Sequence, residues 1–152
     1  MTTDLKLFIA GEWTEGTGED HYEVYSPVTG EHIYNVPKAS EADIDRAVVA
    51  GREATEEMRH WTAFERADLC LRIHQLWQDR VEDVARILTL EQGKPYQQES
   101  LDDIQESGDY FQIAAEDVKR LAGEVIPTTE RNRRMFTVHR PIGVWTAITP
   151  WN

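Results

Sequence analysis

Hydrophobic positions in the first quarter of the chain follow the pattern of short strands. The stretch "LKLFIAGEW" (residues 5–13) is apolar and aromatic and contains Gly11. The stretch "EVYSPVTGEHIYNVP" (23–37) has two extended runs on either side of "SPVTG". Pro27 and Gly30 supply turn chemistry between those runs. The pattern predicts an antiparallel hairpin or a small sheet.

After these strands the apolar residues recur at the three- and four-residue steps of amphipathic helices. The sequences Ser40–Asp43 and Thr62–Glu65 both fit an N-terminal capping box, so a helix is predicted to begin at each. Behind the second cap the apolar positions predict either one long helix or two helices with a break near Asp79–Glu82. Gly93 and Pro95 are expected to end this stretch.

A third helix and two strands are predicted in the remaining part of the chain. The helix runs from Ser100 to Gly123. The sequence "RNRRMFTVHR" (131–140) reads as a basic turn that leads into an alternating strand, which Pro141 interrupts because proline lacks a backbone N–H. The run "GVWTAIT" (143–149) is almost continuously apolar, as in a central parallel strand that is covered on both faces. Since a parallel sheet needs further strands, this one is expected to open a sheet that the chain does not complete.

Composition and charge narrow the classes of protein. The net charge is −12, with 28 acidic against 16 basic residues, which argues against nucleic acid or an anionic membrane as a partner. Twelve of the basic residues are arginine and four are lysine. This balance fits either a protein kept soluble in high salt or an ordinary acidic cytosolic protein. No apolar run is long enough for a membrane span, and no signal-peptide pattern is present, so a cytoplasmic location is expected.

Few residues in the body of the chain suggest chemistry. The single cysteine, Cys70, excludes a disulfide framework, and its place on an apolar helix face predicts a buried structural thiol rather than a nucleophile. His74 follows it by four residues, but two residues do not make a metal site, so no metal is predicted. Residues 91–95, "EQGKP", do not match a phosphate-binding loop and read as a helix stop with a solvated lysine. The basic residues of 131–134 either clamp an anion or, as we favour, form a salt-bridging turn.

The end of the chain, "ITPWN", is more suggestive. Asn152 follows the predicted parallel strand, and ligands bind at the carboxyl ends of strands in open α/β sheets. An amide N–H group placed there can stabilise a developing oxyanion. The residues alone leave open whether Asn152 does this or is an ordinary loop asparagine.

Together these stretches resemble the N-terminal part of the NAD(P)-dependent aldehyde dehydrogenase superfamily. "SPVTGE" (26–31) is similar to the N-P-A-T-G-E turn of the family. Residues 65–95 resemble its long helical segment, which ends in E-x-G-K-P. "RPIGVWTAITPWN" (140–152) resembles the most specific motif of this region, P-x-G-V followed by I-x-P-W-N. The order and spacing of these pieces carry the assignment.

The resemblance covers nearly the whole chain, from "LFIAGEW" (7–13) onward, and the departures are modest. Ser26 stands where the family usually has asparagine, and Val28 stands where it has alanine. Thr149 precedes the proline where many members have an aliphatic residue. None of these changes removes a residue that carries chemistry.

The resemblance implies an α/β fold, namely the incomplete N-terminal part of the aldehyde dehydrogenase fold. Its expected parts are an edge β-hairpin, amphipathic helices, an arm strand and the first strand of the dinucleotide-binding sheet. Residues 1–140 would form the helical segment with the hairpin and the first strand of an oligomerisation arm. Residues 141–152 would be the truncated start of the dinucleotide-binding domain. The full-length protein would be a homo-oligomer, a dimer or a tetramer.

The resemblance also implies an oxidoreductase that oxidises a small aldehyde to a carboxylic acid with NAD or NADP, through a cysteine thiohemiacetal. The backbone of residues 148–151 (Ile148, Thr149, Pro150 and Trp151) would lie along the nicotinamide nucleotide, and Asn152 would help to form the oxyanion hole. The nucleophilic cysteine and the general-base glutamate of the family come after this point, and Cys70 does not match the nucleophile motif. The chain would therefore be an inactive N-terminal fragment.

An alternative is a non-catalytic remnant that acts as an interaction module. It would bind a full-length subunit through the arm strand "MFTVHR" (135–140). The sequence does not identify the aldehyde, and it does not distinguish NAD from NADP, because the residues that would decide both lie outside it.

Overall fold

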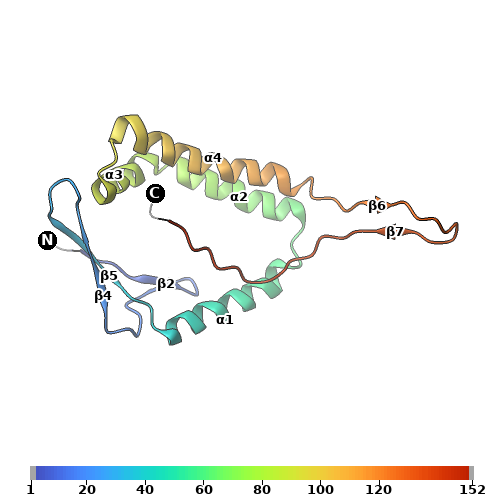
Figure 1. Ribbon diagram of the computed structural model, residues 1–152, viewed down its shortest axis with the longest axis horizontal. Helices are drawn as coiled ribbons and strands as arrows, with labels where there is room; N and C mark the ends of the chain where they lie inside the picture. Colours follow the sequence, from blue (N-terminus) through green and yellow to red (C-terminus); the bar gives the residue numbers. More distant parts are fainter. Residues whose placement is uncertain (1–2, 151–152) are drawn as a thin grey trace.

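The computed structural model describes residues 3–150, and these begin with a three-stranded sheet (Figure 1). Strands β1 (Thr3–Asp4), β5 (His32–Pro37) and β4 (His21–Tyr25) lie in the order β1-β5-β4. β4 pairs antiparallel with β5 and places His21 opposite Pro37, whereas β1 runs parallel to β5. The small sheet predicted for this region is therefore confirmed, with an added parallel edge strand.

A separate hairpin follows β1 and precedes β4 in the sequence. Strand β2 (Leu7–Ile9) pairs antiparallel with β3 (Glu12–Thr14). The two connecting residues, Ala10 and Gly11, both have positive φ angles, of 55° and 84°. Two successive positive φ angles suit the tight turn of a right-handed twisted hairpin, and glycine adopts them without a steric penalty. The predicted hairpin is thus also present.

Helix α1 (Glu41–Met58) begins at the predicted capping box, which is confirmed. The Ser40 side chain accepts a hydrogen bond from Asp43 N, and the Asp43 carboxylate accepts one from Ser40 N at 3.0 Å. Asp43 is fully buried, and the same carboxylate oxygen also accepts from Thr17 N at 2.8 Å. The cap therefore also ties the loop before β4 to the start of α1.

We expect this cap to make the stability of the chain depend on pH in acid. Hydrogen bonds from Thr17 and Ser40 lower the pKa of Asp43 from 3.8 to about 2. Because the pKa is lower in the folded state, the stabilisation is present above the unfolded value and is lost as the pH falls from about 4 towards about 2. Asp43→Asn is expected to lower the melting temperature by several degrees near neutral pH and to flatten its dependence on pH in that window. Melts of the two proteins followed by circular dichroism measure both effects.

The control for this prediction is Asp45→Asn, which makes the same change of charge at an exposed position of α1. It is expected to keep the acid dependence of the unmodified chain. An equal effect of the two substitutions would show that net charge, and not the cap, governs stability in acid.

The next helical stretch consists of two helices, which settles the alternative that the sequence leaves open. Helix α2 (Ala63–Gln78) begins at a capping box formed by Thr62, and α3 (Val81–Gln92) follows after a break at residues 79–80. Gly93 has a φ of 73° and ends α3 in the left-handed conformation, as predicted for a glycine that stops a helix.

The last helix is shorter than the sequence predicts. A π-helical turn, η1 (Tyr96–Ser100), leads into α4 (Leu101–Val118), which ends five residues before Gly123. A Cβ atom on Gly123 would lie 1.9 Å from the carbonyl oxygen of Thr137. Gly123 is therefore required where two backbone segments approach each other at the base of the arm, and its role there is different from ending the helix.

Helices α2 and α4 lie side by side and form the main packing interface of the chain (Figure 1). Few hydrophobic residues are fully buried, and most of those in the helices are small. No helix within residues 3–150 is long and apolar enough to cross a membrane. The buried hydrophobic residues are Ile9, Ala67, Ala85, Ile104 and Ala115.

A two-stranded arm projects from the helices (Figure 1). It consists of β6 (Val125–Ile126) and β7 (Met135–Phe136), which pair antiparallel. The strand predicted within residues 131–140 is thus limited to its first two apolar residues. In the turn, Arg133 forms an ion pair with Glu130 at 3.1 Å, in agreement with the salt-bridging turn favoured from the sequence.

Residues 141–150 do not form the parallel strand that their apolar sequence predicts. They run as an extended segment without regular secondary structure, shown in dark red in Figure 1. A strand is defined by hydrogen bonds to a neighbour, and no other described residue offers this segment one. The segment leaves its apolar side chains largely exposed.

Candidate coenzyme-binding segment

Three of the predicted site residues lie at the end of the extended segment. Ile148, Thr149 and Pro150 are all exposed, and their backbone groups make no hydrogen bond to another described residue. Trp151 and Asn152, the other two predicted site residues, lie outside the described residues. The structure therefore presents an accessible strip of free backbone donors and acceptors at the predicted place.

Two contacts determine the course of this strip. Pro141 lines a cavity of about 400 Å³ between the start of α2, at Ala63, and the end of α4. After Gly143, which has a φ of 108°, Val144 packs against Gly51 of α1. The segment thus passes first the α2–α4 pair and then α1 before it reaches the predicted site.

The segment is uncharged. Residues 141–150 carry no charged side chain, and their polar groups are the backbone, the hydroxyls of Thr146 and Thr149 and the indole N–H of Trp145. A free extended backbone can donate to and accept from ribose and carboxamide groups, whereas phosphates are bound by helix N-termini, basic side chains or glycine-rich loops. The segment therefore offers unpaired backbone and hydroxyl groups, and no charged group, to a partner.

Two of the sequence stretches that carry the family resemblance contact each other in the structure. The turn after β4 closes with a hydrogen bond of 2.8 Å from Gly30 N to Ser26 O. A Cβ atom on Gly93 would lie 3.0 Å from a methyl group of Val28 and 3.2 Å from the ring of Pro27. The "SPVTG" turn therefore packs directly on the glycine that ends α3.

The lysine of "EQGKP" differs from its prediction. Lys94 was expected to be solvated, but its side chain is mostly buried and pairs with Asp103 of α4. Partial burial raises the pKa of Glu91 in the same stretch. The charge of Lys94 is already matched within the chain, so this stretch joins α3 to α4 and offers no phosphate site.

Cys70 and His74 form no reactive pair. Cys70 lies on α2 as predicted and is partly buried rather than fully so. The Nδ1 atom of His74 lies 2.9 Å from the carbonyl oxygen of Gly108, so the imidazole links α2 to α4. Among residues 3–150, no group of three or more histidine, cysteine or carboxylate side chains could hold a metal ion.

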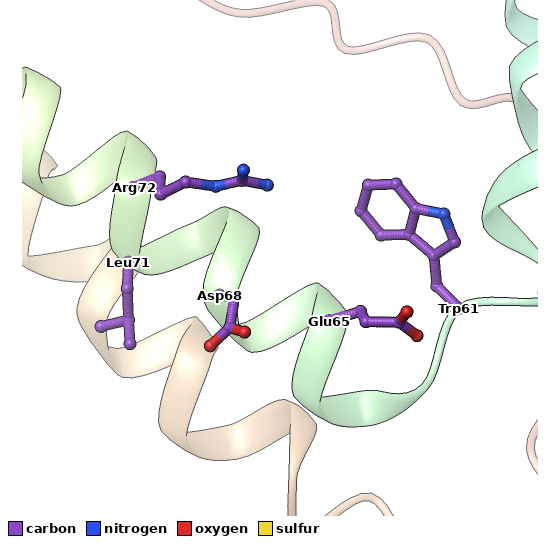
Figure 2. Close-up of a pocket in the computed structure, with 5 residues that line it drawn as sticks. All are labelled: Trp61, Glu65, Asp68, Leu71 and Arg72. Carbon is purple, nitrogen blue, oxygen red and sulfur yellow. The ribbon is translucent and has the colours of Figure 1, made fainter.

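A second hollow of about 570 Å³ lies beside the first part of α2 (Figure 2). In Figure 2 the Arg72 guanidinium and the Trp61 indole extend into the same open space. Glu65 is held by the helix cap, where it accepts from Thr62 N at 2.7 Å, and these cap hydrogen bonds lower its pKa. Its carboxylate is thus committed to the cap, and the hollow contains no nucleophile with an available base. The remaining lining residues are Asp68 and Leu71.

The folded parts match those of known dehydrogenases. The succinate-semialdehyde dehydrogenase structure from Burkholderia pseudomallei superposes with a TM-score of 0.91 at 39% identity, over 97% of this chain and 30% of that one. The architecture is therefore that of the N-terminal part of a dehydrogenase. More particularly, the model of the aldehyde dehydrogenase family matches residues 13–152. The chain belongs to the aldehyde dehydrogenase family.

Curated relatives agree with this assignment. A 3-sulfolactaldehyde dehydrogenase of Pseudomonas putida is 37% identical over 147 residues, which is 97% of this chain and 30% of the relative. An NADP-dependent succinate-semialdehyde dehydrogenase of Escherichia coli is 35% identical over 147 residues, again 97% of this chain and 30% of the relative. The chain spans about 30% of the length of these relatives.

Two features around the segment escaped prediction from the sequence. From the sequence, Gly51 is interpreted as a small residue on one face of an amphipathic helix, and Gly123 is interpreted as the residue that ends a helix. Each proves to be a point where a distant part of the chain comes close. A glycine in an otherwise regular helical pattern is the one signal that could have drawn attention to Gly51.

Proposed function

We propose that this chain is the N-terminal part of an enzyme that oxidises an aldehyde to a carboxylic acid with NAD or NADP. The observation that carries the proposal is the family match, which extends through the "ITPWN" stretch to Asn152. The free backbone of residues 148–150 supports it, because a nucleotide wall needs groups that are not already paired. In this proposal residues 1–140 are the helical segment with the arm, and residues 141–152 open the dinucleotide-binding domain.

Each part of the segment has a defined task in this reaction. Bound coenzyme supplies the hydride acceptor. The backbone of residues 148–151 lies along the nicotinamide nucleotide and orients it. Asn152 donates its amide N–H to the oxygen of the aldehyde, where negative charge develops when a thiolate attacks the carbonyl carbon. The thiolate and the base that activates water are supplied by residues that this chain does not contain.

We further propose a substrate class, namely short aldehydes that carry an anionic group. Relatives named for succinate semialdehyde, glutarate semialdehyde and 3-sulfolactaldehyde support it. The full-length enzyme is expected to show a kcat/KM for succinate semialdehyde about tenfold or more above that for butanal, because a hydrogen bond to a charged group is worth about 1.5–3 kcal/mol. Formation of NADH or NADPH with each aldehyde measures the ratio.

Two controls accompany this assay. The 152-residue chain alone is expected to show no turnover above that of its Cys70→Ala variant, because neither the nucleophile nor the base is present. Absence of coenzyme reduction by the full-length protein with every aldehyde tested would refute the proposed oxidation. Equal kcat/KM values for the two aldehydes would refute only the anionic substrate class.

We also propose that the enzyme is a cytoplasmic homo-oligomer, a dimer or a tetramer, that assembles through the arm. The exposed apolar side chains of Val125 and Phe136 support this, because they project from the helices on a two-stranded ribbon that has little stability alone. The same exposed surface would serve the alternative function, an interaction module that binds a full-length subunit. Co-purification of the 152-residue chain with that subunit, together with an inactive full-length protein, would favour the alternative.

Adaptation to salt is a further proposal that rests on the acid-rich, lysine-poor composition, with 28 acidic residues and four lysines. If the enzyme works in high salt, the melting temperature of the full-length protein is expected to rise with KCl concentration. At about 1 M the screening length falls to roughly 3 Å, which weakens repulsion among surface carboxylates. A KCl series followed by thermal melts tests this. A melting temperature that stays flat or falls identifies an ordinary acidic protein.

A further inference from the structure

Gly51 occupies a position in α1 where any side chain would press on the extended segment. A Cβ atom added there would lie 3.2 and 3.3 Å from the two methyl groups of Val144. Such distances are shorter than ordinary van der Waals contact, so a side chain at this position would push Val144 outward. Glycine destabilises a helix interior relative to alanine, and its presence here coincides with this close approach.

The contact is specific to Val144. Its side chain is 44% exposed, whereas Ile142, Trp145 and Ile148 are 77%, 76% and 93% exposed. Figure 1 shows the dark-red segment passing the second half of α1. Residues 145–150 are all exposed, and the close approach of Val144 to Gly51 precedes residues 148–150 along the segment.

We propose that Gly51 is a positioning residue for the coenzyme-binding segment. It acts through Val144, because the absence of a side chain sets how closely the segment lies against α1. Ile148 follows four residues later, which is about 13 Å along an extended backbone. A displacement at Val144 is therefore carried directly into the strip that faces the nucleotide. This inference rests on the proposed function.

The test replaces Gly51 in the full-length enzyme with a larger residue. Gly51→Leu is expected to weaken NAD or NADP binding and to lower the rate of hydride transfer by about 10- to 100-fold, since a shift of about 1 Å at a reacting centre has effects of this size. Adding Val144→Ala removes the methyl groups that the leucine meets, so the double variant is expected to recover most of both losses. Hydrogen exchange of residues 142–150 gives a readout that is independent of turnover, with faster exchange expected in Gly51→Leu and slower exchange after rescue.

Ala42→Leu is the matched control. Ala42 is exposed and lies nine residues before Gly51, which places it on the opposite side of α1. The control variant is expected to bind coenzyme as the unmodified enzyme does. Gly51→Ala adds only the Cβ atom, and it is expected to change binding and exchange in the same direction by less than Gly51→Leu. It provides the test should the larger variant fail to fold.

These experiments distinguish failure of the proposed function from failure of the positioning role of Gly51. If the unmodified protein reduces no coenzyme with any aldehyde, the proposed function is wrong. If the unmodified enzyme is active and the Gly51 variants keep normal coenzyme affinity and normal exchange of residues 142–150, the positioning role is wrong. It is also wrong if Val144→Ala fails to restore binding in a folded Gly51→Leu protein.

Discussion

Trp77→Ala is expected to lower the free energy of unfolding of the chain by about 3 kcal/mol, the lower end of the range for truncating large aromatic side chains. The indole lies between α2 and α4, where its Nε1 donates to the carbonyl oxygen of Ile104 at 2.6 Å. Its ring centroid is 6.1 Å from that of Phe111. A Cβ atom on Gly108 would lie 2.6 Å from the indole, so α4 has a glycine at the point where the ring sits. Because few large side chains are fully buried, we expect the half-buried indole of Trp77 to account for much of the packing between α2 and α4.

Urea unfolding of the 152-residue chain, followed by circular dichroism, measures the effect. Trp77→Phe keeps most of the ring and loses the donor, so it is expected to cost about 1 kcal/mol, the net value of one hydrogen bond. Phe64→Ala removes an exposed aromatic side chain from the same helix and is expected to change stability by less than about 0.5 kcal/mol. Similar losses for Trp77→Ala and Phe64→Ala would contradict a specific role of the indole.

The helices are the part of the fold that the sequence predicted best, because their signals are local. Both capping boxes, at Ser40 and Thr62, form as predicted, since each needs only four consecutive residues. Gly93 ends α3 for an equally local reason. After Thr62 the periodic spacing could not decide between one helix and two. The break at residues 79–80 is only two residues long, so the apolar positions before and after it keep nearly the same spacing.

Long-range contacts account for the errors. The helix predicted to reach Gly123 ends earlier, because that glycine is required for a close approach to Thr137, which is distant in sequence. Lys94 was expected to be solvated, yet it pairs with Asp103 across the turn that joins α3 to α4. The spacing of apolar residues could not predict that Thr137 lies beside Gly123 or that Asp103 pairs with Lys94. Gly123 meets Thr137 because β6 and β7 form a hairpin, and Lys94 meets Asp103 because the chain turns between α3 and α4.

The extended segment, residues 141–150, shows a different limit of prediction from the sequence. The apolar run of residues 143–149 predicts a strand, but a strand needs a neighbour, and none of the described residues provides one. An exposed edge of this kind can pair with other chains and promote aggregation. The candidate site has the same limit, since the motif located residues 148–150 in the sequence, whereas the approach of Val144 to α1 was visible only in the structure.

Asn152→Ala in the full-length enzyme is expected to lower the rate of acylation by about 10²–10³, or roughly 2.7–4 kcal/mol, the usual effect of losing one oxyanion donor. The motivation is the position of Asn152 at the end of "ITPWN" in a chain of the aldehyde dehydrogenase family. The amide donates to a charge that exists only after attack on the carbonyl. Its loss should therefore affect turnover more than substrate binding, and coenzyme affinity should change little.

Asn152→Asp is expected to be slower still, because a carboxylate repels the oxyanion to which the amide donates. The competing explanation is a structural asparagine that holds its loop, which predicts a lower melting temperature or weaker coenzyme binding instead. Pre-steady-state hydride transfer, measured beside a coenzyme titration and a thermal melt, separates the two explanations. A normal rate per folded, coenzyme-bound site in Asn152→Ala would exclude the oxyanion role. A slow rate with normal melting and normal coenzyme binding requires it, because only the transition state then differs between the two proteins.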